Sequence, residues 1–549
     1  MASLREQEQR FVLPLAVPGT ATDRDIVAPS RGPAYGAHRA IAAEHPAASL
    51  AGMTVLQRGG SAIDAAIAAS AVSVVVKPYW TQLGGDAFAL VWHRGTNTVE
   101  CLNAGGRASR NATLDRFPDG IPARGALAST VPGLVDAWSE LHKRHGRRPL
   151  DELLAPAIAL AEDGFPVSKR LAGATTMLAD GAQRIDDATT RRTFLRSGER
   201  PYNEGDTFRQ PDLAGTLRAI ASGGRDGFYG GRVGRAIAGA MRAAGGLIDE
   251  DDLAAPAALW HEPLTTTYRG CTVYEQALPS QGMILLEALN IVEQFSLGDD
   301  VLSSADAVHL LVEATRLAFA DARRYAADPL VEAVPVATLL SKEHAARRAA
   351  EIDLAQAKRH TAAVVPCDTT SFVVADEELA VAFIQSVFWP WGSGFTVPGT
   401  GILMNNRMTG FSTDPGHPNR VAPGKRTVHT LNQFLAVKDG ELIVGGGTPG
   451  GDYQVQTNLQ TIAGVIDFSL DIQAAIDAPK WATLGNNDLA IEARFPDETL
   501  RELESRGHGI RRLAAWDAAL ARSQVVASVS GGGWAVASDL RGEGAALAT

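Results

Sequence analysis

The sequence is poor in cysteine and in aromatic residues, and it has no excess of positive charge. Its 549 residues include 3 cysteines, 6% are aromatic, and the formal net charge is −11. Three cysteines without a C-x-x-C spacing exclude a disulfide framework and a thiolate metal site, and they predict buried, reduced thiols at Cys101, Cys271 and Cys367. Nucleic acid is an unsuitable main partner, because phosphate binding requires a basic surface.

Long hydrophobic runs are also absent. The longest apolar stretch, residues 62–76, contains Asp64 and two serines, which indicates a buried helix running into a strand and not a membrane span. The first 17 residues place Arg5 and Glu6 ahead of any apolar run, so they do not form a secretory signal. We therefore expect a cytoplasmic protein without a membrane partner. The absence of H-E-x-x-H, and of histidines at ligand spacing, predicts no catalytic metal.

The N-terminal two-thirds of the chain carries mainly helical patterns. At this length we expect two packed units or one large multilayer sandwich. Residues 1–40 predict a loosely packed lead-in, and 130–360 are expected to be mostly helical. The remaining N-terminal predictions are a helix over 46–58 stopped by Gly59-Gly60, an N-cap at Ser61, a hairpin over 87–102, and an amphipathic helix over 304–329 ended by Pro329.

The pattern changes to strands after residue 360. Residues 371–388 alternate in the way typical of a hairpin that turns at 376–378, and 434–446 predict a second hairpin that turns on Asp439-Gly440. The C-terminal third is therefore predicted to be rich in β structure.

Short motifs in a fixed order carry a specific resemblance. They are CDTTSFVVAD (367–376), with HPAASLAGMTVLQRGGSAIDAAIA, PYWTQLGGDAF, VPGLVDAW, FYGGRVG, LPSQGMILLEALN and EATRLAFADARRYAADP before it and GTGILMNNRMTGFS, HPNRVAPGKR and GGTPGG after it. In this order they resemble the gamma-glutamyltranspeptidase family. The resemblance implies an α+β fold, the four-layer αββα sandwich of the N-terminal-nucleophile hydrolases, and no cofactor. It also implies two associated chains from one precursor, a large one of 41–368 after the lead-in and a small one of 369–549.

Thr369 is the residue on which the expected chemistry depends. If the Asp368–Thr369 bond is cut, Thr369 gains an α-amino group a few bonds from its own hydroxyl. Such a group titrates near ~8, so a neutral fraction can take the hydroxyl proton and activate the nucleophile. The same hydroxyl can first attack the Asp368 carbonyl, giving an ester that water opens. The plain alternative is that DTTS is a polar turn before a strand.

Further site residues follow from the resemblance. Gly450 and Gly451, in the loop GTPGG, are implied to line the oxyanion hole, a task that suits backbone N–H groups without side chains in the way. Ser386 corresponds to a hydroxyl residue that bonds the nucleophile, or is simply a buried strand serine. Arg107 lies near the family's carboxylate-clamping arginine, although Gly105 stands at that position itself; a surface arginine is the alternative.

Other positions depart from the gamma-glutamyl pattern. The family's amide, glutamine and aspartate for a substrate amino group are replaced by Phe388, Arg407 and Gly410, and two serines by His429 and Thr430. Arg407 is expected to invert the local charge and so to favour a small anionic acyl group.

The segments FIQSVFWPWGSG, NNRMTGFS and PGKRTVHTLNQ resemble the oxamate amidohydrolases and related members of the family. An amidohydrolase of small, carboxylate-bearing amides is therefore favoured. A gamma-glutamyltransferase or glutathione hydrolase remains the alternative, and an uncleaved, non-catalytic relative is a third.

Overall fold

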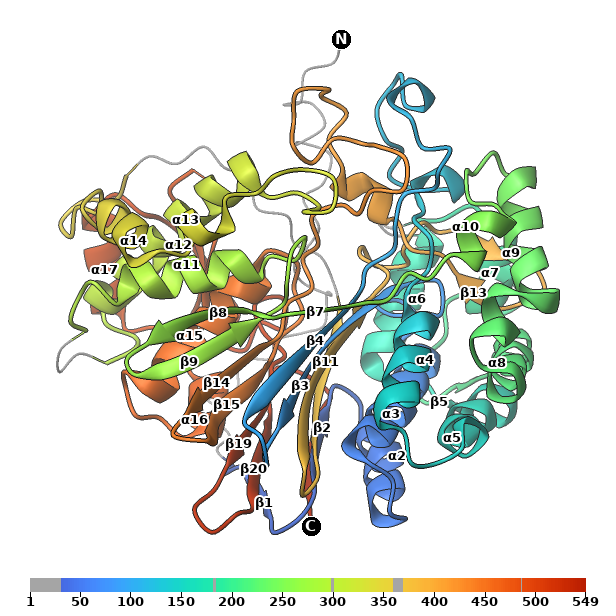
Figure 1. Cartoon of the computed structure of the whole chain (residues 1–549), viewed down its shortest axis with the longest axis horizontal. Helices are drawn as coiled ribbons and strands as arrows, with labels where there is room; N and C mark the ends of the chain where they lie inside the picture. Colours follow the sequence, from blue (N-terminus) through green and yellow to red (C-terminus); the bar gives the residue numbers. More distant parts are fainter. Residues whose placement is uncertain (1–30, 181–183, 298–300, 359–368, 485) are drawn as a thin grey trace.

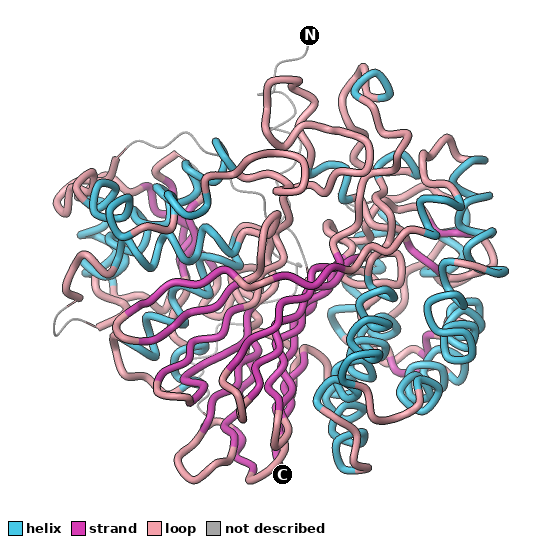
Figure 2. The backbone as a smooth tube through the Cα atoms, viewed as in Figure 1, coloured by secondary structure: helices cyan, strands magenta, loops and turns pink. Residues whose placement is uncertain are grey.

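Two seven-stranded β-sheets run through the middle of the protein (Figures 1 and 2). The structure, a computed structural model, describes residues 31–180, 184–297, 301–358, 369–484 and 486–549. Sheet A has the order β1 (Ala34–Gly36), β20 (Trp534–Ser538), β19 (Gln524–Ser528), β15 (Glu441–Gly447), β14 (Phe434–Lys438), β9 (Cys271–Glu275) and β8 (Leu264–Tyr268). Sheet B has the order β21 (Ala545–Ala548), β2 (Ala40–Ala43), β10 (Thr370–Ala375), β11 (Leu379–Ser386), β3 (Asp86–His93), β4 (Thr98–Ala104) and β7 (Leu259–His261). Neighbouring strands are antiparallel in both sheets.

A helical layer covers the outer face of each sheet (Figure 1). The layer on sheet B contains α2 (Pro46–Gln57), α3 (Ala62–Val76), α4 (Leu134–His145), α5 (Leu150–Asp163), α8 (Pro211–Tyr229) and α9 (Gly231–Ala243). The layer on sheet A contains α11 (Gly282–Val292), α12 (Ala305–Tyr325), α14 (Lys342–Ala349), α15 (Tyr453–Ile466), α16 (Ile472–Asp477) and α17 (Asp497–Ser505). This is the αββα sandwich that the sequence predicts.

Shorter elements complete the described chain. They are α6 (Lys169–Asp180), α7 (Ala188–Phe194), α10 (Glu250–Ala254), α13 (Val336–Leu339), the pair β5 (Phe165–Pro166) and β6 (Thr207–Phe208), the pair β12 (Thr396–Val397) and β13 (Ile402–Leu403), and a three-stranded sheet of β16 (Trp481–Thr483), β17 (Asp488–Glu492) and β18 (Gly509–Leu513).

Each interface between layers has its own apolar core. Between the sheets, buried side chains such as Leu90, Trp92, Val373, Leu435 and Trp534 pack together. A second core joins sheet B to the helices on its outer face, and a third core joins sheet A to the helices on its own outer face. Alternation along β3 explains the division, because successive side chains of a strand point to opposite faces: Leu90 and Trp92 face sheet A, and Ala89 and Val91 face the helices.

The helix starts predicted near residue 46 and at Ser61 are confirmed. Pro46 occupies the first position of α2, and Gly59 with φ 84° follows the end of that helix. Ser61 and Asp64 form a reciprocal capping box at the start of α3. The predicted change from helix to strand within 62–76 is wrong, because the whole stretch is α3. Every residue of α3 is buried, which explains why its pattern lacks a polar face.

The three predicted hairpins are confirmed as β3–β4, β10–β11 and β14–β15. Two other expectations need correction. The described residues of 130–360 are mainly helical, as expected, but they also contain five strands, β5 to β9, and α12 ends at Tyr325, before Pro329. The signal for β8–β9 is present in the sequence: β-branched and aromatic residues flank Arg269-Gly270, which turn with φ values of 50° and 81°.

The predicted lead-in is also shorter than 1–40. Residues 1–30 lie outside the described residues, but β1 pairs with β20 and Ala40 already begins β2. Both sheets combine strands from before and after position 369: β10 and β11 lie between β2 and β3 in sheet B, and β14 pairs with β9 in sheet A. The two portions of the chain therefore share continuous sheets.

Candidate active site

Thr369 lies directly before the central strand β10, and its side chain is only 1% exposed. The Nε2 atom of Gln454, in the first turn of α15, donates a hydrogen bond of 3.3 Å to Thr369 Oγ1. The start of a central strand is a rigid place for a nucleophile, because hydrogen bonds to β2 and β11 hold the backbone on both sides. Asp368, the other half of the predicted cleavage site, and Cys367 lie outside the described residues.

The glycine loop connects β15 to α15 beside the start of β10. Ser371 Oγ donates to the carbonyl of Gly447 over 3.2 Å, which joins the loop to β10. Gly450 and Gly451 have φ values of 131° and 60°, a conformation that favours glycine. Their carbonyls accept the N–H groups of Tyr453 and Gln454 at 3.1 Å, so the two glycines lead directly into the first turn of the helix. Backbone N–H groups at a helix N-terminus suit an oxyanion.

Ser386 ends β11, where it pairs with Asp86 of β3. Its Oγ atom accepts the N–H of Phe388 over 2.7 Å, and Phe388 has a φ of 82°. This hydroxyl therefore helps to hold a left-handed residue in the chain, a local role in addition to the one the resemblance implies.

Arg407 is completely buried and forms an ion pair with Asp86. Its Nε lies 3.4 Å from Asp86 Oδ2, and its Cζ lies 4.0 Å from the centre of the Phe388 ring. His429 Nε2 contacts the same carboxylate oxygen at 3.1 Å, and Gly106 N donates to the other oxygen at 2.8 Å. Burial, followed by the charge of Arg407, lowers the pKa of His429 to about 4 although Asp86 opposes this.

This arrangement corrects the expected inversion of charge. The sequence places no acidic residue near Arg407, but the bridge between Gly84 and Met404 brings Asp86 beside it from the N-terminal portion. The guanidinium is therefore balanced by a buried carboxylate.

A cavity of about 300 Å³ opens next to the glycine loop. Most of its lining is apolar or uncharged, and its charged members are Arg323 and Asp452. Gln281 Nε2 donates to Asp452 Oδ1 over 2.6 Å. Burial lowers the pKa of Arg323, and the nearby Asp452 opposes that effect. The lining residues are Ser280, Gln281, Met283, Ile284, Phe319, Ala322, Arg323, Ala326, Phe388, Trp389, Thr409, Gly410, His417, Asn419, Val428, Thr430 and Asp452.

The cavity brings together only some of the predicted binding residues. Thr430, Phe388 and Gly410 line it, whereas Arg407 lies behind Phe388 and reaches Thr430 Oγ1 through Nη1 at 3.5 Å. Arg107 is not among the lining residues: its Nη2 donates to the Ala255 carbonyl over 3.1 Å.

Sequence reasoning missed Arg323 and Asp452. Arg323 lies in the last turn of an amphipathic helix, where an arginine gives no separate signal, and Asp452 directly follows the two glycines. The position of Asp452 could have marked it as a neighbour of the glycine loop.

In the part of the chain that the structure describes, every helix is too short or too polar to cross a membrane.

The fold and the site together define a class. Two antiparallel sheets between helical layers, with a buried threonine at the start of a central strand and a glycine loop beside it, form the sandwich of the N-terminal-nucleophile hydrolases. A family model described as Gamma-glutamyltranspeptidase matches residues 48–549, and this chain belongs to that family.

Several relatives are similar over nearly their whole length. The chain is 35% identical over 524 residues to the glutathione hydrolase-like YwrD proenzyme of Bacillus subtilis and 37% identical over 524 residues to the oxamate amidohydrolase proenzyme of Klebsiella pneumoniae; each alignment covers 93% of this chain and 98% of the relative. Among solved structures, cephalosporin acylase from Bacillus halodurans matches with a TM-score of 0.90 and 36% identity, covering 97% of this chain and 99% of that one. These similarities make the chain a hydrolase of this family, of the type produced as a proenzyme.

Proposed function

We propose that this protein cuts itself before Thr369 and then hydrolyses amides through an acyl-enzyme on the Thr369 hydroxyl. The observation that carries the proposal is the position of Thr369: it is buried at the start of β10, and its Oγ1 accepts a hydrogen bond from Gln454 beside the glycine loop. A threonine that served only as part of a polar turn would gain nothing from this placement at the junction of β10 and α15.

The processing step uses the same hydroxyl that later performs catalysis. Thr369 Oγ attacks the Asp368 carbonyl carbon, the peptide C–N bond breaks, and the nitrogen takes a proton to become the free α-amino group of Thr369. Water then hydrolyses the resulting ester and leaves the Asp368 carboxylate and the free hydroxyl. The products are the chains 1–368 and 369–549.

Turnover repeats this chemistry on a substrate. The α-amino group of Thr369 takes the hydroxyl proton, Oγ attacks the amide carbonyl, and the amine leaves with a proton. Backbone N–H groups of Gly450 and Gly451 stabilise the oxyanion, and Ser386 supports the site from the end of β11. Water then removes the acyl group.

The two chains would stay together as a heterodimer. Processing leaves β10 and β11 of the small chain hydrogen-bonded between β2 and β3 of the large chain. Separation would break both sheets, so no disulfide is required. Within the described residues Cys101 and Cys271 are free and buried, which suits the cytoplasmic location included in this proposal.

For the substrate, we favour an amide whose small acyl part carries a carboxylate, as in oxamate. The similarity to oxamate amidohydrolase supports this choice, as does the absence of a gamma-glutamyl-type amide and acid at Phe388 and Gly410. Thr430 would contact the substrate directly, with Arg407 and His429 holding that wall of the cavity through the contacts to Thr430 and Asp86. Arg323 supplies a cation on the cavity wall, and Arg107 would act only after leaving Ala255.

Two observations favour a second candidate with a larger acyl group. The cavity of about 300 Å³ reaches the size range of pockets for drug-sized ligands, and its lining is mostly uncharged. Two similarities are consistent with a larger acyl group, such as the gamma-glutamyl group of an amide in glutathione metabolism. One is to the structure of cephalosporin acylase, and the other is to the glutathione hydrolase relatives.

Mass spectrometry of the purified protein tests the nucleophile. We expect two chains with a new N-terminus at Thr369, a single uncut chain without activity for Thr369→Ala, and cleavage as in the wild type for the neighbouring control Thr370→Ala. A Thr369→Ala protein that is still cut at the same bond would refute the mechanism. A continuous wild-type chain would instead support the non-catalytic alternative.

Matched rate measurements test the substrate. Ammonia release from oxamate, release of nitroaniline from a gamma-glutamyl nitroanilide, and hydrolysis of an amide with a bulky acidic acyl group should be compared at equal enzyme concentration. The favoured proposal requires the highest kcat/KM for oxamate. Rapid turnover of the gamma-glutamyl compound without oxamate hydrolysis would overturn it.

A further inference from the structure

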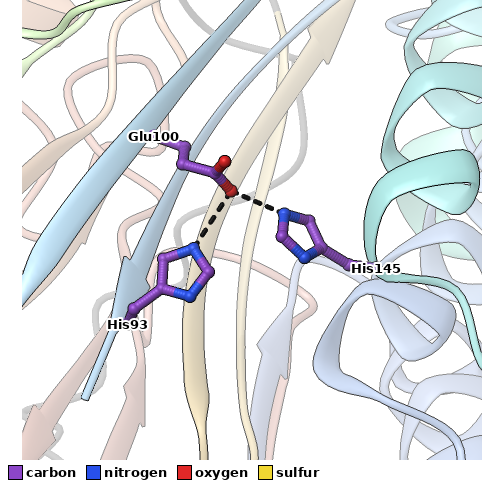
Figure 3. A group of neighbouring side chains, drawn as sticks. All are labelled: His93, Glu100 and His145. Atoms are coloured by element: carbon purple, nitrogen blue, oxygen red, sulfur yellow. Dashed lines mark hydrogen bonds and ion pairs between the residues drawn. The ribbon is translucent and has the colours of Figure 1, made fainter. Parts of the chain in front are cut away.

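Three side chains that lie far apart in the sequence or on different elements converge in sheet B, at the end of β3 opposite to Asp86 (Figure 3). His93 ends β3, Glu100 lies in β4, and His145 ends α4. His93 Nε2 lies 3.0 Å from Glu100 Oε2, and His145 Nε2 lies 2.5 Å from the same oxygen. One nitrogen from each imidazole and one carboxylate oxygen thus share a single small volume.

The strand register explains this convergence. Val91 pairs with Glu100 and His93 pairs with Thr98, so His93 and Glu100 are diagonal neighbours on one face of the hairpin. Val91 belongs to the core between sheet B and its helices, so this is the face that α4 covers. The last residue of α4 therefore brings His145 over the same two side chains.

The cluster is reachable from solvent. The side chains of His93 and Glu100 are each 26% exposed, and that of His145 is 15% exposed. An ion can therefore enter without unfolding of the hairpin.

Arg144 holds the carboxylate in a fixed orientation. Its Nη1 donates to Glu100 Oε1 over 2.6 Å, which leaves Oε2 for the two imidazoles. Its Cζ lies 3.9 Å from the centre of the Trp260 ring, so the guanidinium is stacked on the indole while it holds Glu100 Oε1. A hydrogen bond to the second carboxylate oxygen is the kind of outer contact that orients a ligand, although the charge of Arg144 weakens the attraction for a cation.

We propose that His93, Glu100 and His145 form a binding site for a divalent ion of the zinc type. Zinc takes imidazole nitrogen and carboxylate oxygen at about 2.0–2.2 Å, so tetrahedral ligand atoms lie roughly 3.3 Å apart. The observed separations of 3.0 and 2.5 Å need only a small opening of the side chains to reach this value. Calcium and magnesium prefer all-oxygen sites, and two imidazoles select against them.

The site would act on stability and not on the amide chemistry. His93 lies at one end of β3, and Asp86, at the other end, lies beside Ser386 and Arg407. A bound ion would tie the tip of the β3–β4 hairpin to the end of α4, with water in the fourth position. The spacing 93, 100 and 145 matches no metal motif, which is why the sequence predicts no ion there.

Calorimetric titration of the processed, chelator-treated protein with zinc chloride tests this proposal. The wild type should bind one ion with a dissociation constant at or below about 10 μM. His93→Gln and His145→Gln should each weaken binding at least roughly tenfold. His142→Gln is the matched control, because His142 lies in the same last turn of α4 but bonds the Arg148 carbonyl. Zinc should raise the thermal unfolding midpoint of the wild type and of His142→Gln, but not those of His93→Gln and His145→Gln.

Three outcomes would overturn the proposal. The first is no zinc binding by the wild type below about 100 μM, which would leave the cluster as an ion pair only. The second is equal binding by wild type and His145→Gln when metal-free unfolding midpoints show that both are folded. The third is loss of binding in His344→Gln, which would move the ion to Glu287, Asp321 and His344, where Arg348 already pairs with Asp321.

Discussion

Replacing Arg407 by methionine would leave Asp86 as a buried carboxylate without its cation. Both side chains are completely buried, and the Arg407 Nε atom lies 3.4 Å from Asp86 Oδ2. Removing one partner of a buried pair typically costs about 3–5 kcal/mol of folding free energy, because the other charge stays desolvated. Asp86 keeps His429 Nε2 and the N–H of Gly106 as partners, so we expect the lower end, about 3 kcal/mol at neutral pH.

The same substitution should change how stability depends on pH, through His429. In the wild type the pKa of folded His429 is about 4, against about 6.5 for a histidine in an unfolded chain, so between these values the unfolded chain binds a proton that the folded protein does not. Stability from this group is therefore present above pH 6.5 and is lost as pH falls toward 4, by about 3 kcal/mol in total. Without Arg407 the repulsion disappears and Asp86 remains, while burial, the larger cause, still lowers the pKa, so the pKa of folded His429 should rise partway and part of this acid-side loss should vanish.

Denaturant unfolding of the processed protein at pH 7.5 and pH 5.0 measures both effects. Arg407→Met should be clearly less stable than the wild type at pH 7.5, and the difference should shrink at pH 5.0. Arg407→Lys is the control, because it keeps the charge and should retain the steep pH dependence. A difference between Arg407→Met and wild type that is the same at both pH values, or larger in acid, would refute the coupling among Arg407, Asp86 and His429.

Two further predictions concern the core and the glycine loop. Arg541→Met should lower the free energy of unfolding by about 3–5 kcal/mol in urea titrations. The substitution leaves the fully buried carboxylates of Glu492 and Asp539 without the guanidinium that binds both. An unchanged unfolding midpoint would contradict this. Gly450→Ala should reduce kcat by about 100-fold or more, because φ at this position is 131° and its N–H is proposed to face the oxyanion. Gly440→Ala is the control. Gly440 also has positive φ but lies in an open turn, so this variant should keep wild-type kcat.

Elements specified by adjacent residues could be predicted from the sequence. Asp439-Gly440 fixes the turn of β14–β15 because both residues have positive φ, 52° and 79°. Ser61 could be recognised as a cap because its partner Asp64 is three residues away. The role of Thr369 is also inferred from adjacent groups, its own amino and hydroxyl groups, and it stays a prediction.

Elements specified by distant residues could not be predicted. Every residue of α3 is buried, so the helix has no polar face, and neither its period nor its end is visible in the pattern. The partner of Arg407 is Asp86, 321 positions earlier, and a long-range bridge between Gly84 and Met404 brings their segments together. The cluster of His93 and His145 has the same origin, because it depends on the docking of α4 over one face of a hairpin.

Substrate selection should therefore depend on both portions of the chain. Since Asp86 balances Arg407 behind Phe388, the charge that a substrate meets in the cavity comes from Arg323 and Asp452. Arg323 lies on α12, before the proposed cut, and Asp452 follows the glycine loop, after it. If the substrate binds in this cavity, a carboxylate on its acyl group would have to lie near Arg323 and away from Asp452. We therefore expect a preference for anions whose charge lies away from the glycine loop. The distance between the carboxylate and the reacting carbonyl, and not charge alone, should then separate oxamate-like amides from longer acyl groups.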